Sequence, residues 1–312
     1  MIVHRMLVTA SRAGAAAGIA ATAAFAPNAA AAPGPVPGAP SAVARSHGIR
    51  HVGDATMGWR SKTARLSTTS GASAGPMPAA SQIAHAGDSR TLLPSSAAAP
   101  QTAGLDISNF TPSEPWAAWK SSGVRFAYIK ASEGNYYTSP AFNRQYTGAS
   151  TAHVIRGAYH FANPSVSGGA AQADYFINHG GGWSPDGQTL PGALDMEWNP
   201  YSGNSCYDKT PAQLQQFVTD FTTRYKARTG TSPIIYTASS WWNTCMGTST
   251  KWATTPLWIA DYRATLGPLP AAWSGTTQTI WQNAEQSGAG YDTDVFNGSQ
   301  VALASFATKG AR

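Results

Sequence analysis

The sequence lacks long apolar runs, grouped metal ligands and, in its first hundred residues, nearly all aromatic side chains. No stretch reaches the roughly 18 uninterrupted apolar residues that a membrane-spanning helix needs, so we expect no membrane span. His153, His160 and His179 are scattered and stand at no spacing that suits a metal ion, which disfavours a zinc or redox enzyme. We therefore expect neither a metal nor another cofactor.

Positive charge is confined to the first third of the chain. Residues 1–100 hold eight Lys or Arg against two acidic residues, Asp54 and Asp88, whereas the rest holds thirteen residues of each sign. The net charge of +6 therefore belongs to the N-terminal part. Because the remainder is balanced, the overall basicity does not indicate nucleic acid or a membrane surface as a partner.

Residues 1–32 are typical of a secretory signal peptide. Arg5 and Arg12 form a basic start, and Ala13 to Ala26 make a short apolar stretch. The alanines from Ala30 to Ala32 then offer a small-residue cleavage site. We therefore expect a secreted, extracellular protein.

Residues 33–102 are rich in Ala, Ser, Gly and Pro, and hold one tryptophan, Trp59, but no Tyr or Phe. A segment of this composition cannot bury enough apolar surface to offset its chain entropy. We interpret it as a pro-segment or linker that is removed or disordered, with a small folded pro-domain as the alternative.

Residues 103–312 are expected to form one domain, because they hold all twelve Tyr and ten of the eleven Trp. Both cysteines, Cys206 and Cys245, fall in this part. In an exported protein two cysteines favour one disulfide over two free thiols. Closing a loop of roughly 40 residues would stabilise the fold by about 4 kcal/mol in the chain-entropy model.

Short β-rich runs alternate with helical patterns through this domain, which predicts a parallel α/β barrel. The expected strands are Gly104–Ser108, Arg125–Ala131, Val154–Phe161, Gly192–Trp198, Pro233–Ala238, Pro256–Tyr262, Thr277–Gln282 and Asp292–Phe296. The expected helices are Ser113–Ser121, Pro140–Ala152, Gly169–Asn178 and Thr210–Thr229. The last third of the chain is poorer in helix than an ordinary eightfold barrel requires.

The expected strand Gly192–Trp198 carries two acids, Asp195 and Glu197, two residues apart. On an extended strand such side chains point to the same face, roughly 6.5 Å apart. Two carboxyls this close cannot both ionise freely, so one pKa should rise and the pair could divide acid and base duties. The interleaved Met196 and Trp198 favour burial of the pair, and two solvent-facing acids are the alternative.

Polar residues end several of the expected strands. They are Asp106, Lys130, His160, Asp195, Glu197 and Gln282. Catalytic groups of an α/β barrel gather at the C-terminal ends of its strands, so this coincidence supports a catalytic role for the pair Asp195 and Glu197.

Seven sequence blocks carry a family resemblance. They are Gly104-Leu-Asp-Ile-Ser-Asn109, Tyr128-Ile-Lys-Ala-Ser-Glu-Gly134, Gly157-Ala-Tyr-His-Phe-Ala162, Ala193-Leu-Asp-Met-Glu-Trp198, Pro256-Leu-Trp-Ile-Ala-Asp-Tyr262, Ile280-Trp-Gln282 and Asp292-Thr-Asp-Val-Phe-Asn-Gly298. Over about residues 103–309 the chain resembles glycoside hydrolase family 25, the Chalaropsis-type lysozymes. The resemblance implies N-acetylmuramidase activity on peptidoglycan glycan strands. It also implies a flattened, irregular TIM-like α/β barrel of eight strands with about five helices, which we expect to act as a monomer.

The resemblance implies roles for four acids. Glu197 would be the general acid/base and Asp195 its partner carboxylate, while Asp106 would polarise the pair. Asp292 aligns with the fourth acid, and Asp294 is the alternative, with one of these two expected to be only a loop residue. An N-cap role is the alternative for Asp106, although the first helix of the domain is expected to begin later.

The resemblance also implies residues near the sugar. Lys130 could neutralise part of the acid cluster, and Tyr137 could stack on a sugar ring or form a hydrogen bond with it. The other expected substrate-binding residues are Tyr159, His160, Tyr236, Trp258, Tyr262 and Gln282. Packing in the core is the alternative for several of them.

Rival functions and mechanisms stay open at this point. A chitinase-like hydrolase has its own Asp-x-Glu strand, and a cell-wall-binding protein that has lost catalysis is a second alternative. An extracellular structural domain is a third, which would leave the acids at the strand ends without a purpose. Within the hydrolase reading, Asp195 could attack the sugar directly, which suits carboxyls about 5–5.5 Å apart. Alternatively, the acetamido group of the substrate could attack while Asp195 orients it.

Overall fold

The computed structural model describes residues 36–59, 100–286 and 290–311, which all belong to one unit that begins at Ala32. The signal peptide expected at residues 1–32 lies outside the described residues. No helix in the described part combines the length and the apolar character of a membrane crossing.

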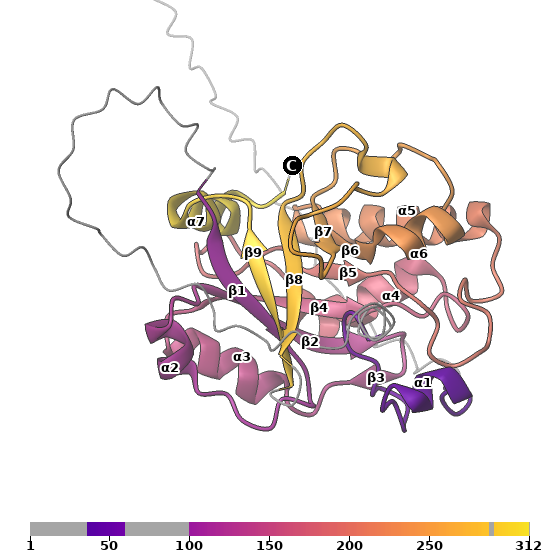
Figure 1. Cartoon of the computed structure of the whole chain (residues 1–312), viewed down its shortest axis with the longest axis horizontal. Coiled ribbons are helices and arrows are strands. Elements are labelled where there is room, and N and C mark those ends of the chain that lie inside the picture. Colours follow the sequence, from indigo (N-terminus) through magenta and orange to yellow (C-terminus); the bar gives the residue numbers. More distant parts are fainter. Residues whose placement is uncertain (1–35, 60–99, 287–289, 312) are drawn as a thin grey trace, which may run out of the picture. The chain divides into compact units, whose positions relative to one another are not determined.

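Eight strands of the described part close into a barrel (Figure 1). In the order of their hydrogen-bonded neighbours they are β1 (Thr102–Ile107), β9 (Tyr291–Phe296), β8 (Ile280–Gln286), β7 (Leu257–Ala260), β6 (Ile234–Ala238), β5 (Ala193–Asp195), β4 (Ile155–Phe161) and β2 (Phe126–Glu133). The pairing of β1 with β2 closes the barrel. A two-residue strand, β3 (Tyr137–Thr138), pairs with the end of β2. The expected irregular barrel of eight strands is confirmed.

Strand β9 departs from the all-parallel arrangement that the alternating pattern predicts. It runs antiparallel to both of its neighbours, β8 and β1. Because only residues 287–290 separate β8 from β9, the two strands pair antiparallel and the sequence leaves no room for a crossover helix between them. This explains why the last third of the sequence holds less helix. It also brings the start of β9 to the barrel end where the other strands finish.

The helices lie outside the barrel or at one of its ends. The four expected ones are α2 (Trp116–Ser121), α3 (Phe142–Thr151), α4 (Gly169–Phe176), which continues into a wider turn at Ile177–Gly181, and α5 (Pro211–Thr229). Three further helices are α1 (Ala42–Ser46), α6 (Ser239–Cys245) and α7 (Gln300–Lys309). Thr210 caps α5 by accepting a hydrogen bond from the backbone N–H of Gln213, whose side chain accepts in return from the N–H of Thr210. This reciprocal cap fixes the start of α5.

The interior of the barrel is filled by side chains at one end. Its buried cluster includes Phe126, Tyr128, Tyr159, Tyr236, Trp258, Ile280 and Phe296, together with Leu303 and Ala307 of α7. Figure 1 shows α7 beside the start of β1. A larger cluster between the strands and the outer helices includes Leu105, Ile129, Leu194, Ile259, Phe176 and Phe221. Among the described residues, the side chains near α7 fill the interior, so the end opposite α7 is the open approach for a ligand.

Residues 36–59, which we call the N-terminal segment, have a defined structure although the composition of residues 33–102 predicts none. Ser41 caps α1, and the segment buries Ala44, Ile49, Met57 and Trp59. Ala44, Ile49 and Trp59 pack together in a small cluster that Phe161 and Trp198 of the barrel domain complete, and Met57 enters the cluster inside the barrel. Figure 1 shows the segment beside β3. The rest of residues 33–102 up to residue 99 lies outside the described part.

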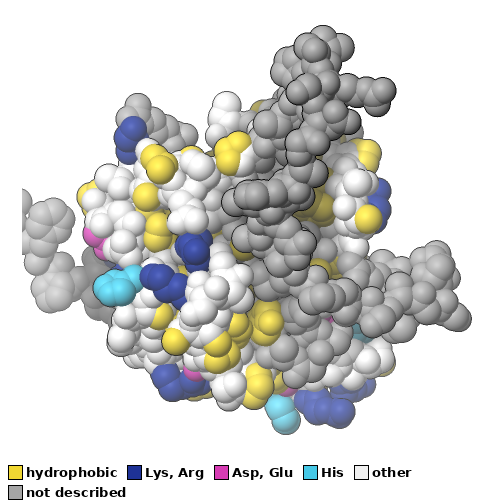
Figure 2. All heavy atoms as spheres, turned by 60° about the vertical axis from the view of Figure 1, so that its left-hand side comes forward, with side chains coloured by type: hydrophobic (Ala, Val, Ile, Leu, Met, Phe, Trp, Pro, Cys, Tyr) yellow, Lys and Arg dark blue, Asp and Glu magenta, His cyan; other side chains and the backbone are white. Residues whose placement is uncertain are grey.

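The surface of the molecule carries separated charges. Figure 2 shows Lys and Arg side chains at several points of one face, between hydrophobic and neutral side chains.

Cys206 and Cys245 form the expected disulfide, with their Cα atoms 5.4 Å apart. The bond joins the loop between β5 and α5 to the last residue of α6. Trp241 supports the same junction, because its Nε1 donates a hydrogen bond to the backbone oxygen of Ser205 at 3.0 Å. The disulfide therefore anchors the long loop that follows the pair Asp195 and Glu197.

Replacing both cysteines (Cys206→Ser with Cys245→Ser) should lower the free energy of unfolding by about 4 kcal/mol, because the open loop restores entropy to the unfolded chain. Urea unfolding followed by tryptophan fluorescence measures the loss. A reductant should lower the urea midpoint of the wild type to that of the double variant and leave the variant unchanged. Equal midpoints for the two proteins without reductant would contradict this expectation.

Candidate active site

Asp195 and Glu197 meet at the open end of the barrel. Asp195 is the last residue of β5 and Glu197 follows the strand, which is shorter than expected. The backbone nevertheless stays beside β6, because the N–H of Met196 donates to the backbone oxygen of Tyr236 at 3.0 Å. Asp195 and Glu197 are 0% and 1% exposed. The structure therefore gives the burial that the interleaved apolar residues predict.

The two carboxyl groups are close enough to share a proton. Burial raises the pKa of Asp195 well above its usual range, and the charge of Glu197 and a hydrogen bond with its carboxyl add to this effect. No N–H group of the described residues donates to either carboxyl oxygen of Asp195. Without such donors the charged form is poorly solvated, so the pair retains a proton.

Asp106 and Asp292 lie opposite each other on β1 and β9. Gln282 of β8 joins them, since its Nε2 donates to Asp106 Oδ2 at 2.7 Å and to Asp292 Oδ2 at 3.3 Å. Its Oε1 accepts hydrogen bonds from the hydroxyls of Tyr236 at 2.7 Å and Tyr262 at 2.8 Å. One amide therefore holds two acids and two tyrosines in a fixed arrangement.

Asp294 lies on the same face of β9 as Asp292 but one step deeper in the barrel. Trp258 donates from its Nε1 to Asp294 Oδ1 at 2.9 Å. Burial and the neighbouring Asp106 raise the pKa of Asp294. Both acids thus belong to a strand, and the expectation that one is a loop residue is wrong. Asp292 borders a hollow at the barrel mouth, whereas Asp294 and Trp258 are part of the core beneath it.

Lys130 is a fully buried cation at the site. Its Nζ donates to Glu133 Oε2 at 2.7 Å and to the backbone oxygens of Gly53, at 2.9 Å, and Ala55. Its positive charge lowers the pKa of Asp195 and so opposes the increase in that pKa that burial causes. The structure thus places Lys130 beside the acid cluster, where its charge partly compensates the carboxyls.

Glu133 is a buried residue of the sequence block Tyr128–Gly134, and no sequence pattern assigns it a role. It accepts hydrogen bonds from Tyr136 at 2.8 Å and from Tyr201, besides its ion pair with Lys130. An odd spacing from Lys130 would place it on the other face of a regular strand. The irregular register between Lys130 and Ser132 changes this alternation. In the sequence, the only signal for a role of Glu133 is an acid three residues after a lysine in a β-rich run.

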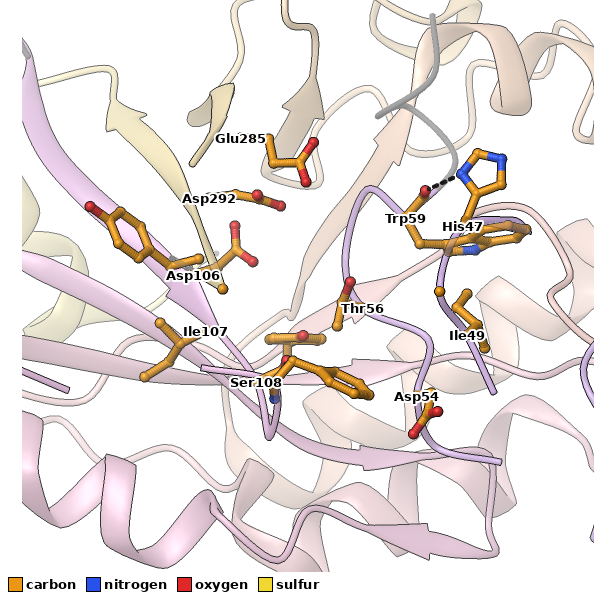
Figure 3. A pocket seen from close by; sticks show the side chains of 15 residues that line it. His47, Ile49, Asp54, Thr56, Trp59, Asp106, Ile107, Ser108, Glu285 and Asp292 are labelled. Carbon is orange, nitrogen blue, oxygen red and sulfur yellow. Dashed lines mark hydrogen bonds between the residues drawn. The ribbon is translucent and has the colours of Figure 1, made fainter. Parts of the chain in front are cut away.

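A hollow of about 180 Å³ opens beside Asp106 and Asp292 (Figure 3). On the barrel side it is also lined by Ile107, Ser108, Phe110, Tyr159, Glu285, Gly290 and Tyr291. On the other side it is lined by His47, Gly48, Ile49, Asp54, Thr56 and Trp59 of the N-terminal segment. Glu285 is a further acid near the site, and no sequence pattern indicates it. Its pairing with Asp292 across β8 and β9 explains its position.

The structure does not bring His160 to this site. Its Nδ1 accepts from Ser132 Oγ at 2.9 Å, and its Nε2 donates to Gln172 Oε1 at 3.0 Å. The ring stacks against Phe221 of α5, in the layer between the barrel and the outer helices. Burial lowers the pKa of His160 to about 3, so the imidazole is neutral. Successive residues of β4 face opposite sides, so Tyr159 points into the barrel and His160 points out of it.

Tyr137 lies at the rim of the site on β3. Its ring faces Lys130, with Nζ 5.3 Å from the ring centroid. Burial raises the pKa of Tyr137 to about 12, so its hydroxyl stays protonated at neutral pH. Six of the expected substrate-binding residues thus lie at one end of the barrel, namely Lys130, Tyr137, Tyr159, Tyr236, Tyr262 and Gln282. The other two, Trp258 and His160, lie in core layers.

Known proteins share this barrel. Residues 105–290 match the model of Glycosyl hydrolases family 25. The chain is 46% identical over 210 residues to the N,O-diacetylmuramidase of Chalaropsis sp, which covers 66% of this chain and 98% of that protein. It is 44% identical over 230 residues to Lysozyme M1 of Streptomyces globisporus, covering 72% and 76% respectively. The solved muramidase of Trichobolus zukalii is 47% identical with a TM-score of 0.64, over 67% of this chain and 99% of that chain.

Replacing Asp294 with asparagine should stabilise the fold increasingly as pH rises. The native state must keep a proton on Asp294, whose pKa is raised above the unfolded value of 3.8. Wild-type stability therefore falls as pH rises from 3.8 toward the raised native pKa, by at most about 1.4 kcal/mol per pH unit. Asparagine has no such proton to hold, and its Oδ1 can still accept from Trp258.

Urea unfolding of both proteins from about pH 3 to pH 7 measures this difference. The free energy of unfolding of Asp294→Asn relative to the wild type should become more favourable across this range. A difference that does not depend on pH would show that Asp294 ionises as easily in the folded protein as in the unfolded one.

Proposed function

The chain belongs to glycosyl hydrolases family 25 and is a glycoside hydrolase, and from that premise we propose that it hydrolyses the β-1,4 bond between N-acetylmuramic acid and N-acetylglucosamine in peptidoglycan. The observation that carries this proposal is the pair of buried carboxyl groups, Asp195 and Glu197, at the open end of the barrel, where burial raises the pKa of Asp195. The names of the relatives, lysozyme and muramidase, support peptidoglycan as the substrate.

Glu197 is the general acid in this proposal. Glycoside hydrolysis needs a proton for the leaving oxygen and stabilisation of an oxocarbenium-like centre. The proton retained between Asp195 and Glu197 is available for the first task. After the bond breaks, the Glu197 carboxylate takes a proton from the incoming water, so one residue serves as acid and then as base.

Asp195 is the partner carboxyl that orients the substrate. When the one proton of the pair is on Glu197, Asp195 is ionised and can accept a hydrogen bond from the acetamido N–H of the substrate. In the route that we propose, the acetamido oxygen attacks the sugar carbon while Asp195 holds the acetamido group in place. Asp106 and Asp292, held by Gln282, contribute negative charge near the developing cation.

Glu197→Gln should slow the clearance of purified bacterial cell walls by about 10²- to 10⁴-fold, because glutamine keeps the shape but supplies no proton. The test uses residues 100–312, since a solved muramidase is matched over 99% of its length by 67% of this chain and therefore folds without an N-terminal extension. Asp220→Asn, on the outer helix α5, is the matched control and should clear walls like the parent. Equal clearance by Glu197→Gln and its parent would refute the role of Glu197.

The reaction should release products with a reducing muramic acid end, and the new end should first have the β configuration of the cleaved bond. Mass spectrometry of products from defined peptidoglycan identifies the reducing sugar, and proton NMR at early times reports its anomer. Reducing glucosamine would replace the muramidase by a glucosaminidase. An inverted anomer would exclude both roles of Asp195, since direct attack and the acetamido route both retain configuration.

The place of action in this proposal is outside the cell. The signal-like residues 1–32 and the disulfide between Cys206 and Cys245 support export. The residues of the proposed site all come from one chain, and we propose that the enzyme acts as a monomer.

A further inference from the structure

We propose that the N-terminal segment, residues 36–59, is an autoinhibitory segment that occupies the glycan cleft and keeps the enzyme latent until it is displaced. This inference rests on the proposed function, because it assigns an inhibitor to the same site. Four sets of contacts support it, and each joins the segment to a group that the proposed reaction needs.

The first contact is made with the proposed proton donor. The backbone N–H of Gly58 donates a hydrogen bond to Glu197 Oε1 at 2.7 Å. Glu197 is 1% exposed in this arrangement. A glycosidic oxygen must approach that carboxyl closely to receive its proton. The position needed by the leaving oxygen is therefore taken by the main chain of the segment.

The second set of contacts is made with Lys130. Two of the acceptors of its Nζ are the backbone oxygens of Gly53 and Ala55. The N–H of Gly53 in turn donates to the hydroxyl of Tyr201 at 3.1 Å. A buried ammonium group needs acceptors for its protons. The segment supplies neutral carbonyl oxygens here, and the hydroxyl and acetamido oxygens of a glycan could supply the same.

The third observation is the fit of two glycines, Gly53 and Gly58, against aromatic side chains. Both have positive φ, at 92° and 72°, and so have a conformation that favours glycine. A Cβ atom on Gly58 would run into the hydroxyl of Tyr262 and lie 3.0 Å from that of Tyr236. A Cβ atom on Gly53 would run into the ring of Tyr137. The main chain thus lies directly on the surface expected to bind sugar.

The fourth set of contacts is apolar. Met57 is fully buried and belongs to the cluster that fills the barrel, together with Tyr159 and Tyr236. Trp59 is 2% exposed, and its Nε1 donates to the backbone oxygen of Trp198 at 3.1 Å. Burial of these two apolar side chains stabilises the closed arrangement. Figure 3 shows Trp59 and Thr56 across the hollow from Asp106 and Asp292.

The segment is not part of the family barrel. The family model matches residues 105–290, and a solved muramidase is covered over 99% of its length by 67% of this chain. A stretch of that size that includes the barrel cannot also include residues 36–59. The segment is therefore an addition that covers the site and is not an element on which the barrel depends.

Wall clearance by two forms of the protein tests the inference. Residues 100–312 should clear walls, whereas the chain from Pro33 onward should be slower by at least about tenfold, because only the open fraction can bind glycan. Inactivity of both forms would refute the proposed function. Equal activity of both forms would refute autoinhibition and leave the proposed function standing.

Substitutions in the chain from Pro33 onward test which contact of the segment causes the inhibition. Gly58→Val should restore most of the activity, since its side chain cannot fit against Tyr262 at this backbone conformation. Gly38→Val is the matched control, because a Cβ atom there meets nothing within 4 Å, and it should stay latent. A latent Gly58→Val protein would overturn the inference that this contact blocks the site.

A synthetic peptide of residues 36–59 gives a second test that does not depend on the folding of any variant. Added to residues 100–312, it should raise the wall concentration needed for half-maximal clearance and leave the maximal rate unchanged. The same peptide with Gly58→Val should have no such effect. Equal effects of both peptides, or none from either, would overturn the proposal.

Discussion

The burial of several carboxyl groups at one end of the barrel is the constraint on which the rest of the structure depends. Asp195 has no N–H donor among the described residues, and Asp294 has one, from Trp258. In such surroundings a carboxyl holds a proton more easily than a charge. Lys130 offsets part of the negative charge, and Gln282 fixes Asp106 and Asp292 by hydrogen bonds. Burial thus favours a protonated carboxyl group at the position where the proposed reaction needs a proton donor for the leaving oxygen.

The same constraint explains how a polar cleft can be covered without another charge. The N-terminal segment meets the site with main-chain groups, namely the N–H of Gly58 and the carbonyl oxygens of Gly53 and Ala55. A glycan also offers neutral donors and acceptors on a compact frame. Peptide and sugar can therefore use one set of protein groups, and they compete because both satisfy the same buried atoms.

The regular parts of the fold could be predicted from the sequence, because β-rich runs and the capped helix α5 follow local periodicity. Asp195 and Glu197 could be predicted as a buried pair for the same reason. Other features depend on contacts between distant parts of the chain. The direction of β9 follows from its hairpin with β8, and the irregular register of β2 turns Glu133 inward. The side of β4 that faces the barrel interior is likewise set by distant contacts, because His160 stacks on Phe221 of the outer helix α5.

The N-terminal segment shows a further limit of composition. Its few apolar residues form only a small cluster with Phe161 and Trp198, and Met57 enters the cluster inside the barrel. Figure 1 shows the segment beside β3, although residues 60–99 separate the segment from the barrel in the sequence. Burial against a distant surface leaves no signal in the local sequence.

The pairing of β1 with β9 has a consequence for the order of events during synthesis. Asp106 lies 176 residues before its hydrogen-bond partner Gln282, and its strand neighbour β9 comes later still. Contacts between such distant residues form slowly, because a long loop must close first. A nascent chain therefore has no complete acid cluster until β9 has left the ribosome. The degradative chemistry is thereby tied to the completion of the polypeptide.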